Sequence, residues 1–143
     1  MEKSWSPAWK ASSKPRKQRK YRANLPLHQR KKLMQSPLAK ELKKRYGKNA
    51  VTVRSGDTVK VMRGSSRGKA LKVDRVDYTQ ERVYLAGIMA TRKDGTQKPR
   101  GIHPSNVLIT ELNLGDKRRE ESLKNAHENI RKTTEKTTEN KRK

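Results

Sequence analysis

The chain has 143 residues with 38 Lys and Arg against 14 Asp and Glu, and its formal net charge of +24 at pH 7 indicates a polyanionic partner. Only 29% of the residues are hydrophobic and Phe is absent, so we expect one small core flanked by basic segments. A membrane-spanning protein and a disulfide or thiolate site are excluded, because no apolar stretch approaches roughly 18 residues and cysteine is absent.

Residues 1–35 are predicted to form an extended basic arm. Residues 1–50 hold sixteen basic and two acidic side chains, which is more than half of the total charge excess. Trp5 and Trp9 precede the stretch SSKPRKQRKYR, whose Ser, Pro and dense charge cannot bury enough apolar area to offset the entropy of ordering. We therefore expect this arm to become ordered only on its partner.

A short helix and linker are predicted at residues 36–50. In QSPLAKELKKRYGK, Ser36 is placed to cap a helix over about residues 37–46, and the following glycine is placed to end it. Leu38, Leu42 and Tyr46 then share one face. This face fits docking on the protein's own domain better than docking on a partner.

Residues 51–115 change to the period-2 alternation of half-buried strands. The alternating apolar pairs are Val59 and Val61, Leu71 and Val73, and Val83 and Leu85. Asp94 and Gly95 predict a hairpin with a type I′ turn, in which both residues have positive φ, and HPSN at 103–106 predicts a tight turn before VLIT. Five short strands in about 60 residues favour a small, strongly bent barrel.

The loop RGSSRGK lies between the first two of these strands. It does not fit a nucleotide-binding P-loop, because Gly64 and Gly68 enclose three residues instead of four and Ala70 follows Lys69 where Ser or Thr is needed. Gly64 and Gly68 fit a turn with unusual backbone angles. Arg63, Arg67 and Lys69 add charge that a plain turn does not need, and this favours contact with a phosphate backbone.

Residues 116–143 are predicted to form a charged C-terminal tail that is partly helical or disordered. Leu123, Ala126 and Ile130 would share one side of a helix in DKRREESLKNAHENIRK. The final stretch TTEKTTENKRK repeats TTE and is expected to be disordered.

The stretch SGDTVKVMRGSSRGKALKV resembles the KOW motif. With GIHPSNVLITELNL and PLHQRKKLMQSPLAKELKKRYG, the resemblance extends over roughly residues 14–119 and is to the KOW-containing ribosomal protein of the large subunit, twenty-fourth in the bacterial count. KPRKQRKYRANLPLH and GDTVKVMRG are more similar to its archaeal than to its eukaryotic branch. The resemblance implies a mainly β fold, an SH3-like barrel that binds large-subunit ribosomal RNA near its 5′ region, beside the polypeptide exit tunnel, and supports assembly. It also implies neighbouring ribosomal proteins as partners and a cytoplasmic location in the ribosome.

Cationic side chains of the arm, the loop and the second hairpin are the expected RNA contacts, and Tyr21 is expected to stack on an unpaired base. The predicted RNA-binding residues are Lys14, Arg16, Lys17, Arg19, Lys20, Tyr21, Arg22, Arg30, Lys31, Lys32, Arg63, Arg67, Lys69, Arg92, Lys93, Lys98 and Arg100. For Trp5 and Trp9, base stacking and docking on a neighbouring protein both remain open. The charges of Lys40, Lys43, Lys44 and Arg45 fit RNA contact and a solvated helix face equally well.

Other function classes lack their residues in this sequence. No catalytic residues, cofactor, metal site, membrane partner or small-molecule substrate are expected. His28, His103 and His127 are scattered and do not resemble a zinc site, and His103 fits a hydrogen bond that holds the HPSN turn. Asp57 and the other acidic residues of the barrel fit salt bridges better than acid and base catalysis. A transcription elongation factor of the NusG type also uses the KOW barrel and is the first alternative; a small nucleotide hydrolase is the second.

Overall fold

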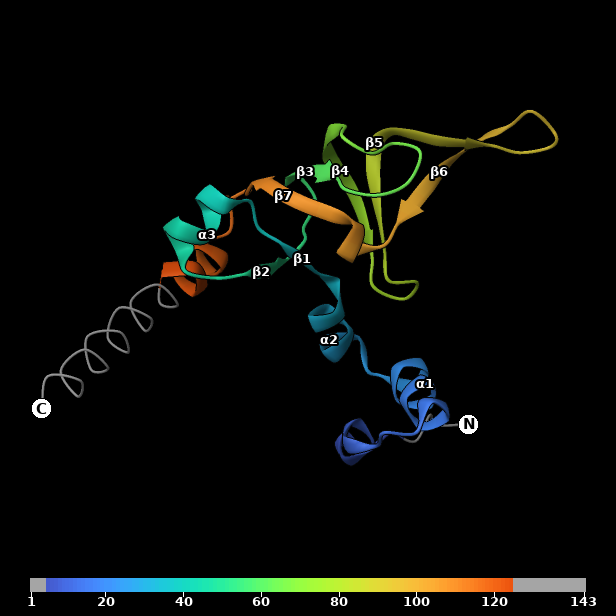
Figure 1. Cartoon of the computed structure of the whole chain (residues 1–143), viewed down its shortest axis with the longest axis vertical. Helices are drawn as coiled ribbons and strands as arrows, with labels where there is room; N and C mark the ends of the chain where they lie inside the picture. Colours follow the sequence, from blue (N-terminus) through green and yellow to red (C-terminus); the bar gives the residue numbers. More distant parts are fainter. Residues whose placement is uncertain (1–4, 125–143) are drawn as a thin grey trace, which may run out of the picture.

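The computed structural model describes residues 5–124, and its centre is a five-stranded antiparallel sheet (Figure 1). The strands are β3 (Thr58–Val61), β4 (Ala70–Asp77), β5 (Arg82–Thr91), β6 (Gln97–Ile102) and β7 (Val107–Glu111). Their order is β6-β5-β4-β3-β7, so successive strands pair as hairpins and β7 returns to pair with β3. The strands predicted from the period-2 alternations are confirmed.

The sheet is bent into a small barrel-like domain, as predicted. Its pairing register shifts between Thr58 and Val59 in β3 and between Tyr84 and Met89 in β5. Such irregularities increase strand twist and bending. The second shift includes Gly87, whose φ of 80° is in the left-handed region that favours glycine. Beyond this point the β5–β6 hairpin projects away from the rest of the sheet (Figure 1).

The core lies inside this bent sheet and is built largely from valine. Its buried members are Met34, Leu38, Val53, Val59, Val61, Val73, Val83, Leu85, Ile88, Val107 and Ile109. Met34 and Leu38 precede the sheet in the sequence, and a short ribbon of β1 (Gln35–Pro37) and β2 (Ala50–Thr52) holds that segment in place. The ribbon segment also contacts β7, since the Ala39 amide donates to the Ile109 carbonyl at 2.8 Å.

The short helix α3 spans Lys40–Tyr46, so the predicted start at Pro37 is wrong. Ser36 is not its cap: this buried side chain donates to the Pro104 carbonyl at 2.6 Å, and the residue lies in β1. The predicted end is confirmed, because Gly47 has the left-handed φ of 63°. Tyr46 is buried and Leu42 packs against the core, which confirms that the apolar face docks on the protein itself.

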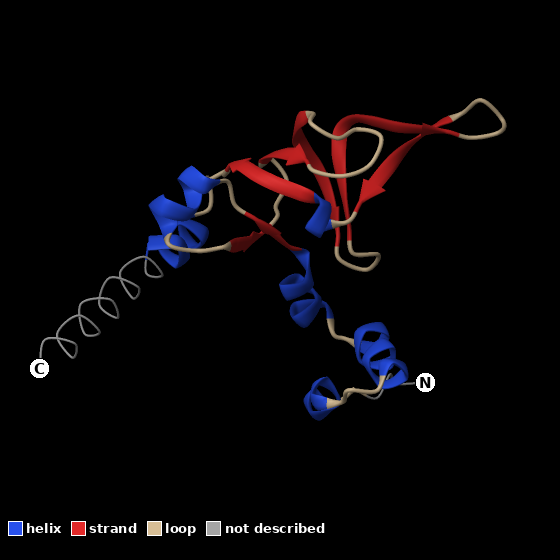
Figure 2. Cartoon of the chain, viewed as in Figure 1, coloured by secondary structure: helices blue, strands red, loops and turns tan. Residues whose placement is uncertain are grey.

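The basic arm is helical where it is described, so the extended course predicted for residues 1–35 is wrong for 7–34. It consists of the 3-10 helix η1 (Pro7–Ala11), α1 (Pro15–Asn24), α2 (Leu27–Arg30) and the 3-10 helix η2 (Lys31–Met34). The reason is local. Proline stands in the first turn of η1 and α1, and the Lys, Arg and Gln residues that fill α1 are good helix formers. Figure 2 shows η1 and α1 apart from the strands, whereas α2 and η2 lead directly into β1.

The β5–β6 turn differs from the predicted type I′ geometry. Gly95 has a φ of 81°, whereas Asp94 is not among the described residues with positive φ. The Arg92 amide donates to the Thr96 carbonyl at 2.9 Å, and the Gly95 amide donates to the Arg92 carbonyl at 3.1 Å. The Asp94 carboxylate accepts from the Thr96 hydroxyl and amide, and these bonds hold the pKa of that carboxyl below its usual range. This loop is one residue longer than the two-residue loop of a type I′ turn. In the longer loop only the glycine takes the left-handed conformation.

The C-terminal segment turns back on the domain. Residues 117–124 are helical, and Leu123 is buried. This segment lies beside α3 (Figure 1), and the Lys48 ammonium donates to the Ser122 carbonyl at 2.9 Å. The expectations for Ala126, Ile130 and the TTE repeat lie outside the described residues. No helix within residues 5–124 has the length and apolar content needed to cross a membrane.

Candidate nucleic-acid interface

Helix α1 presents most of the predicted arm contacts. Its exposed cations are Arg16, Lys17, Arg19, Lys20 and Arg22, and Lys14 precedes its first turn. No residue of α1 is buried. Like charges three and four positions apart on a helix repel each other. A polyanion along this surface would relieve that repulsion.

Two of the predicted contacts also hold the arm against the barrel. Arg22 forms an ion pair with Glu81, at the turn between β4 and β5. The Arg30 guanidinium donates to the Thr79 carbonyl at 2.7 Å, and also to the carbonyls of Ala23 at 2.7 Å and Leu25 at 2.9 Å. Arg30 therefore has a structural role that the charge pattern did not reveal. Lys31 and Lys32 follow in η2 with exposed side chains.

The RGSSRGK loop forms the predicted turn between β3 and β4. Gly64 and Gly68 have φ angles of 97° and 87°, as expected. The Gly68 amide donates to the Val61 carbonyl at 2.8 Å, which closes the loop at its base. Arg63, Arg67 and Lys69 are exposed. The loop thus holds three cations on a hydrogen-bonded backbone, where they can face a phosphate chain.

A second element completes this loop surface. The Arg100 guanidinium in β6 donates to the Ser65 hydroxyl at 3.0 Å and so links β6 to the loop. Arg63, Arg82 and Arg100 line one hollow of about 160 Å³. Arg82 was not among the predicted contacts. Arg82 can lie close to residue 101 because that residue is glycine: a Cβ on Gly101 would lie 2.9 Å from the Arg82 Cβ.

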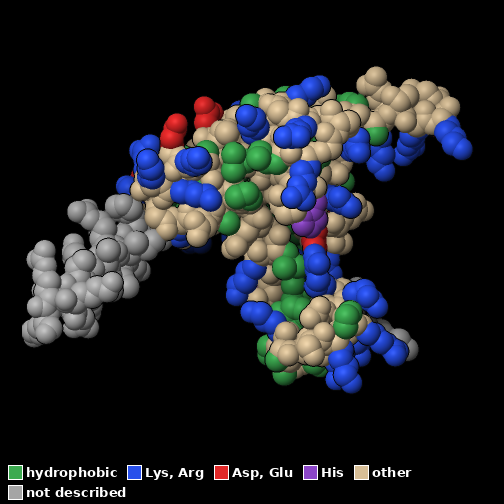
Figure 3. All heavy atoms as spheres, viewed as in Figure 1, with side chains coloured by type: hydrophobic (Ala, Val, Ile, Leu, Met, Phe, Trp, Pro, Cys, Tyr) green, Lys and Arg blue, Asp and Glu red, His purple; other side chains and the backbone are tan. Residues whose placement is uncertain are grey.

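The remaining cations of the second hairpin lie apart from this hollow. Arg92 and Lys93 lie in the turn beyond the end of β5, and Lys98 pairs with Ala90 along the ladder. All three are exposed on the projecting β5–β6 hairpin. The structure therefore separates the predicted contacts into the arm, the loop and the hairpin tip. Figure 3 shows Lys and Arg side chains on all of these parts, with few acidic side chains on the same face.

The aromatic residues of the arm contact each other and a lysine. The rings of Trp5 and Tyr21 pack with their centroids 5.8 Å apart. The Lys20 ammonium lies 4.8 Å from the centroid of the Trp9 ring. Tyr21 is thus already in contact with one aromatic ring.

The HPSN turn has the predicted hydrogen bond. His103 Nδ1 accepts from the Ser105 amide at 3.3 Å and lies 2.8 Å from the Ser105 hydroxyl. Residues Pro104–Asn106 form the 3-10 helix η3. This confirms the turn-holding role of His103.

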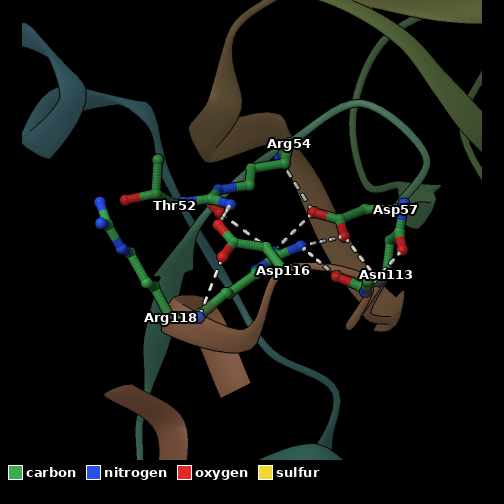
Figure 4. A network of polar contacts seen from close by, with 8 residues as sticks. Thr52, Arg54, Asp57, Asn113, Asp116 and Arg118 are labelled. Carbon is green, nitrogen blue, oxygen red and sulfur yellow. Dashed lines mark hydrogen bonds and ion pairs between the residues drawn. The ribbon is translucent and has the colours of Figure 1, made fainter. Parts of the chain in front are cut away.

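The salt bridge of Asp57 is buried and has Arg119 as its partner, neither of which the sequence pattern indicated. Asp57 and Arg119 are 0% and 6% exposed, and two nitrogen atoms of the guanidinium donate to the two carboxylate oxygens at 2.6 and 2.8 Å. The amides of Arg54 and Asn113 also donate to this carboxylate, each at 2.9 Å (Figure 4). Asp57 therefore joins the loop before β3 to the C-terminal segment. The predicted preference for a salt bridge over acid and base chemistry is confirmed for this residue.

A second, half-buried pair stands beside it. The Arg54 guanidinium donates to the Asp116 carboxylate, and this bond is the main reason why the pKa of that carboxyl lies below its usual range. Within residues 5–124 no cluster of three or more His, Asp or Glu side chains could hold a metal ion.

Comparison with known proteins gives a consistent result. A family model that describes the ribosomal proteins called L26 in eukaryotes and L24 in archaea matches residues 12–126. The large ribosomal subunit protein uL24 of Methanosarcina barkeri is 49% identical over 113 residues, which cover 79% of this chain and 97% of that protein. The uL24 proteins of Korarchaeum cryptofilum and Methanothrix thermoacetophila are 49% and 50% identical, over 78% and 76% of this chain and 86% and 94% of their own lengths.

Proposed function

Because this chain belongs to the family of eukaryotic L26 and archaeal L24 ribosomal proteins, on its archaeal branch, we propose that it binds ribosomal RNA as a structural protein of the large subunit. The family is structural and non-enzymatic, and its place is the cytoplasmic ribosome. The RNA-binding residues that we propose are the predicted contacts of the whole arm from Lys14 to Lys32, of the β3–β4 loop and of the β5–β6 hairpin.

One observation carries the RNA-binding proposal. Among the predicted contacts, all of which lie in the described part of the chain, only Arg22 forms an ion pair with a carboxylate. The remaining predicted contacts have no carboxylate partner within residues 5–124, and the chain as a whole carries a net charge of +24. Phosphate groups would supply a counter-charge, with release of condensed counterions as the driving force.

The mechanism is neutralisation of charge combined with fit of shape. The barrel-like domain holds the loop and the hairpin, and the narrower arm extends the basic surface into crevices of folded RNA. Little sequence readout is expected where the partner is an A-form helix, because side chains cannot read its deep, narrow major groove. Contact with the 5′ region of the RNA, a position beside the polypeptide exit tunnel, and a role in assembly are proposed from family membership alone.

The transcription-factor alternative needs a separately folded domain upstream of the KOW barrel. Leu25 is the only buried residue within residues 5–30, which is too little for a core of the segment's own. This observation favours the ribosomal role.

The test is sucrose-gradient fractionation of source cells at moderate and then at high salt, with detection of this chain. We expect stable co-migration with the large subunit, because many simultaneous phosphate contacts hold the chain in folded RNA. Migration with RNA polymerase, or in the free fractions at moderate salt, would contradict the proposal.

A further inference from the structure

A cleft in the basic arm has features that family membership does not explain. It has a volume of about 480 Å³ and is lined by Trp9, Lys14, Arg16, Lys17 and Lys20. This volume lies in the range of about 300–1,000 Å³ that is typical of small-ligand sites. Trp9 precedes residue 12, where the match to the family begins.

Trp9 is the aromatic residue of the arm that is available in this cleft. Trp5 and Tyr21 pack on each other and do not line it. The Trp9 ring, by contrast, has the Lys20 ammonium 4.8 Å from its centroid. Trp9 is only half-buried, so part of its side chain is also open to a flat ligand.

Among residues 5–124, the lining combines one indole with four cations and includes no acidic side chain. An acidic peptide would neutralise the cations but would leave the indole without a specific partner. An apolar protein segment would cover the indole but would remove ammonium groups from water without compensation. A nucleotide satisfies both parts, because its base can stack on the ring and its phosphates can meet the cations.

We propose that this cleft holds one unpaired nucleotide of an RNA, with the base against Trp9 and the adjoining phosphates against Lys14, Arg16, Lys17 and Lys20. This site rests on the proposed RNA-binding function and adds to it a specific preference for single-stranded RNA. Trp9 makes the stacking contact, and Lys20 moves from the ring to a phosphate.

The chain contains two tryptophans, and this makes fluorescence a direct test. In full-length protein carrying Trp5→Phe, Trp9 is the reporter, and the Phe preserves an aromatic contact with Tyr21. We expect a single-stranded oligoadenylate hexamer to quench its emission, and a duplex RNA of equal length to quench it much less. In the matched variant Trp9→Ala, Trp5 reports and should change little.

Binding of labelled hexamer, followed by anisotropy, measures the contact independently. Loss of one base stack in Trp9→Ala should weaken binding about tenfold, whereas Trp5→Phe should bind as the original protein does. The salt slope should stay unchanged in Trp9→Ala, because no cation is removed. In Lys20→Gln it should fall by about 0.7, the value for one contact to a single strand.

The outcomes separate this site from the wider function. Equal hexamer affinity in Trp9→Ala and the original protein would overturn the nucleotide site. Quenching of the Trp5 emission in Trp9→Ala, without quenching of the Trp9 emission in Trp5→Phe, would overturn it as well. If such a result came with intact, salt-sensitive binding of a ribosomal RNA fragment, the proposed function would stand without it. Failure of the original protein to bind that fragment would instead contradict the proposed function. Unchanged RNA affinity with loss of co-sedimentation in Trp9→Ala would assign Trp9 to a protein contact and would also overturn the site.

Discussion

Replacement of Asp57 by Asn should strongly destabilise the domain. The buried carboxylate accepts two hydrogen bonds from Arg119 and one each from the amides of Arg54 and Asn113. Asn retains a single acceptor oxygen and presents an NH₂ group to the donors. The Arg119 charge, 6% exposed, then has no counter-charge. Breaking a buried ion pair in this way costs about 3–5 kcal/mol, which is a third or more of the stability of many domains.

Urea unfolding followed by far-UV circular dichroism is the appropriate assay, since both tryptophans lie in the arm and do not report on the sheet. Asp74→Asn is the matched control. It makes the same change of charge at an exposed position and should alter the free energy of unfolding by less than about 0.5 kcal/mol. Combining Asp57→Asn with Arg119→Met removes the stranded charge, so the double variant should lose less stability than the sum of the single variants. Equal losses in Asp57→Asn and Asp74→Asn, or simple additivity in the double variant, would refute this account of the pair.

Two further predictions concern the surface. Replacing Arg63, Arg67 and Lys69 together by Gln should weaken binding of a ribosomal RNA fragment and flatten the plot of log K against log salt by up to about three units; an unchanged slope would remove the loop from the RNA-binding face. Because Arg54 lowers the folded-state pKa of Asp116, the stability from this pair is present above the ordinary carboxyl pKa and is lost as pH falls through the folded value. The difference in unfolding free energy between the original protein and Asp116→Asn should therefore shrink below about pH 4, and a difference that grows in acid would contradict this sign.

The strands of the domain were predictable because their signal is local. Val59 and Val61 are buried and Lys60 between them is exposed, so the period of two is visible in the sequence itself. The same alternation fails at Val83, Tyr84 and Leu85, which are all buried. Tyr84 is covered in part by the Arg75 guanidinium, 4.6 Å from its ring centroid, a contact that depends on strand pairing.

One error arose where a distant residue decides the outcome, and another where local helix propensity was underestimated. Ser36 followed by Pro37 has the local pattern of a helix start, but the contact of Ser36 with Pro104 determines its actual position. The arm was predicted to be extended from its charge, whereas the propensity of its residues produces helices.

The candidate interface shows the same division between local and distant information. Its cations were identified from composition and motif. The internal hydrogen bonds of Arg30 and the approach of Arg82 to the loop are consequences of the fold, and no spacing in the sequence reveals them.

The bond between Ser36 and Pro104 has a consequence for synthesis of the chain. These residues are 68 positions apart, and the core residues Met34 and Leu38 depend on the same closure with β7. At about 5–20 residues per second, a ribosome needs roughly 3–14 s to make the intervening chain. For that interval the nascent protein carries its basic arm without the barrel that later positions it. Under the proposed function, the arm is available to RNA before folding is complete, so the order of translation favours capture by RNA first and closure of the core second.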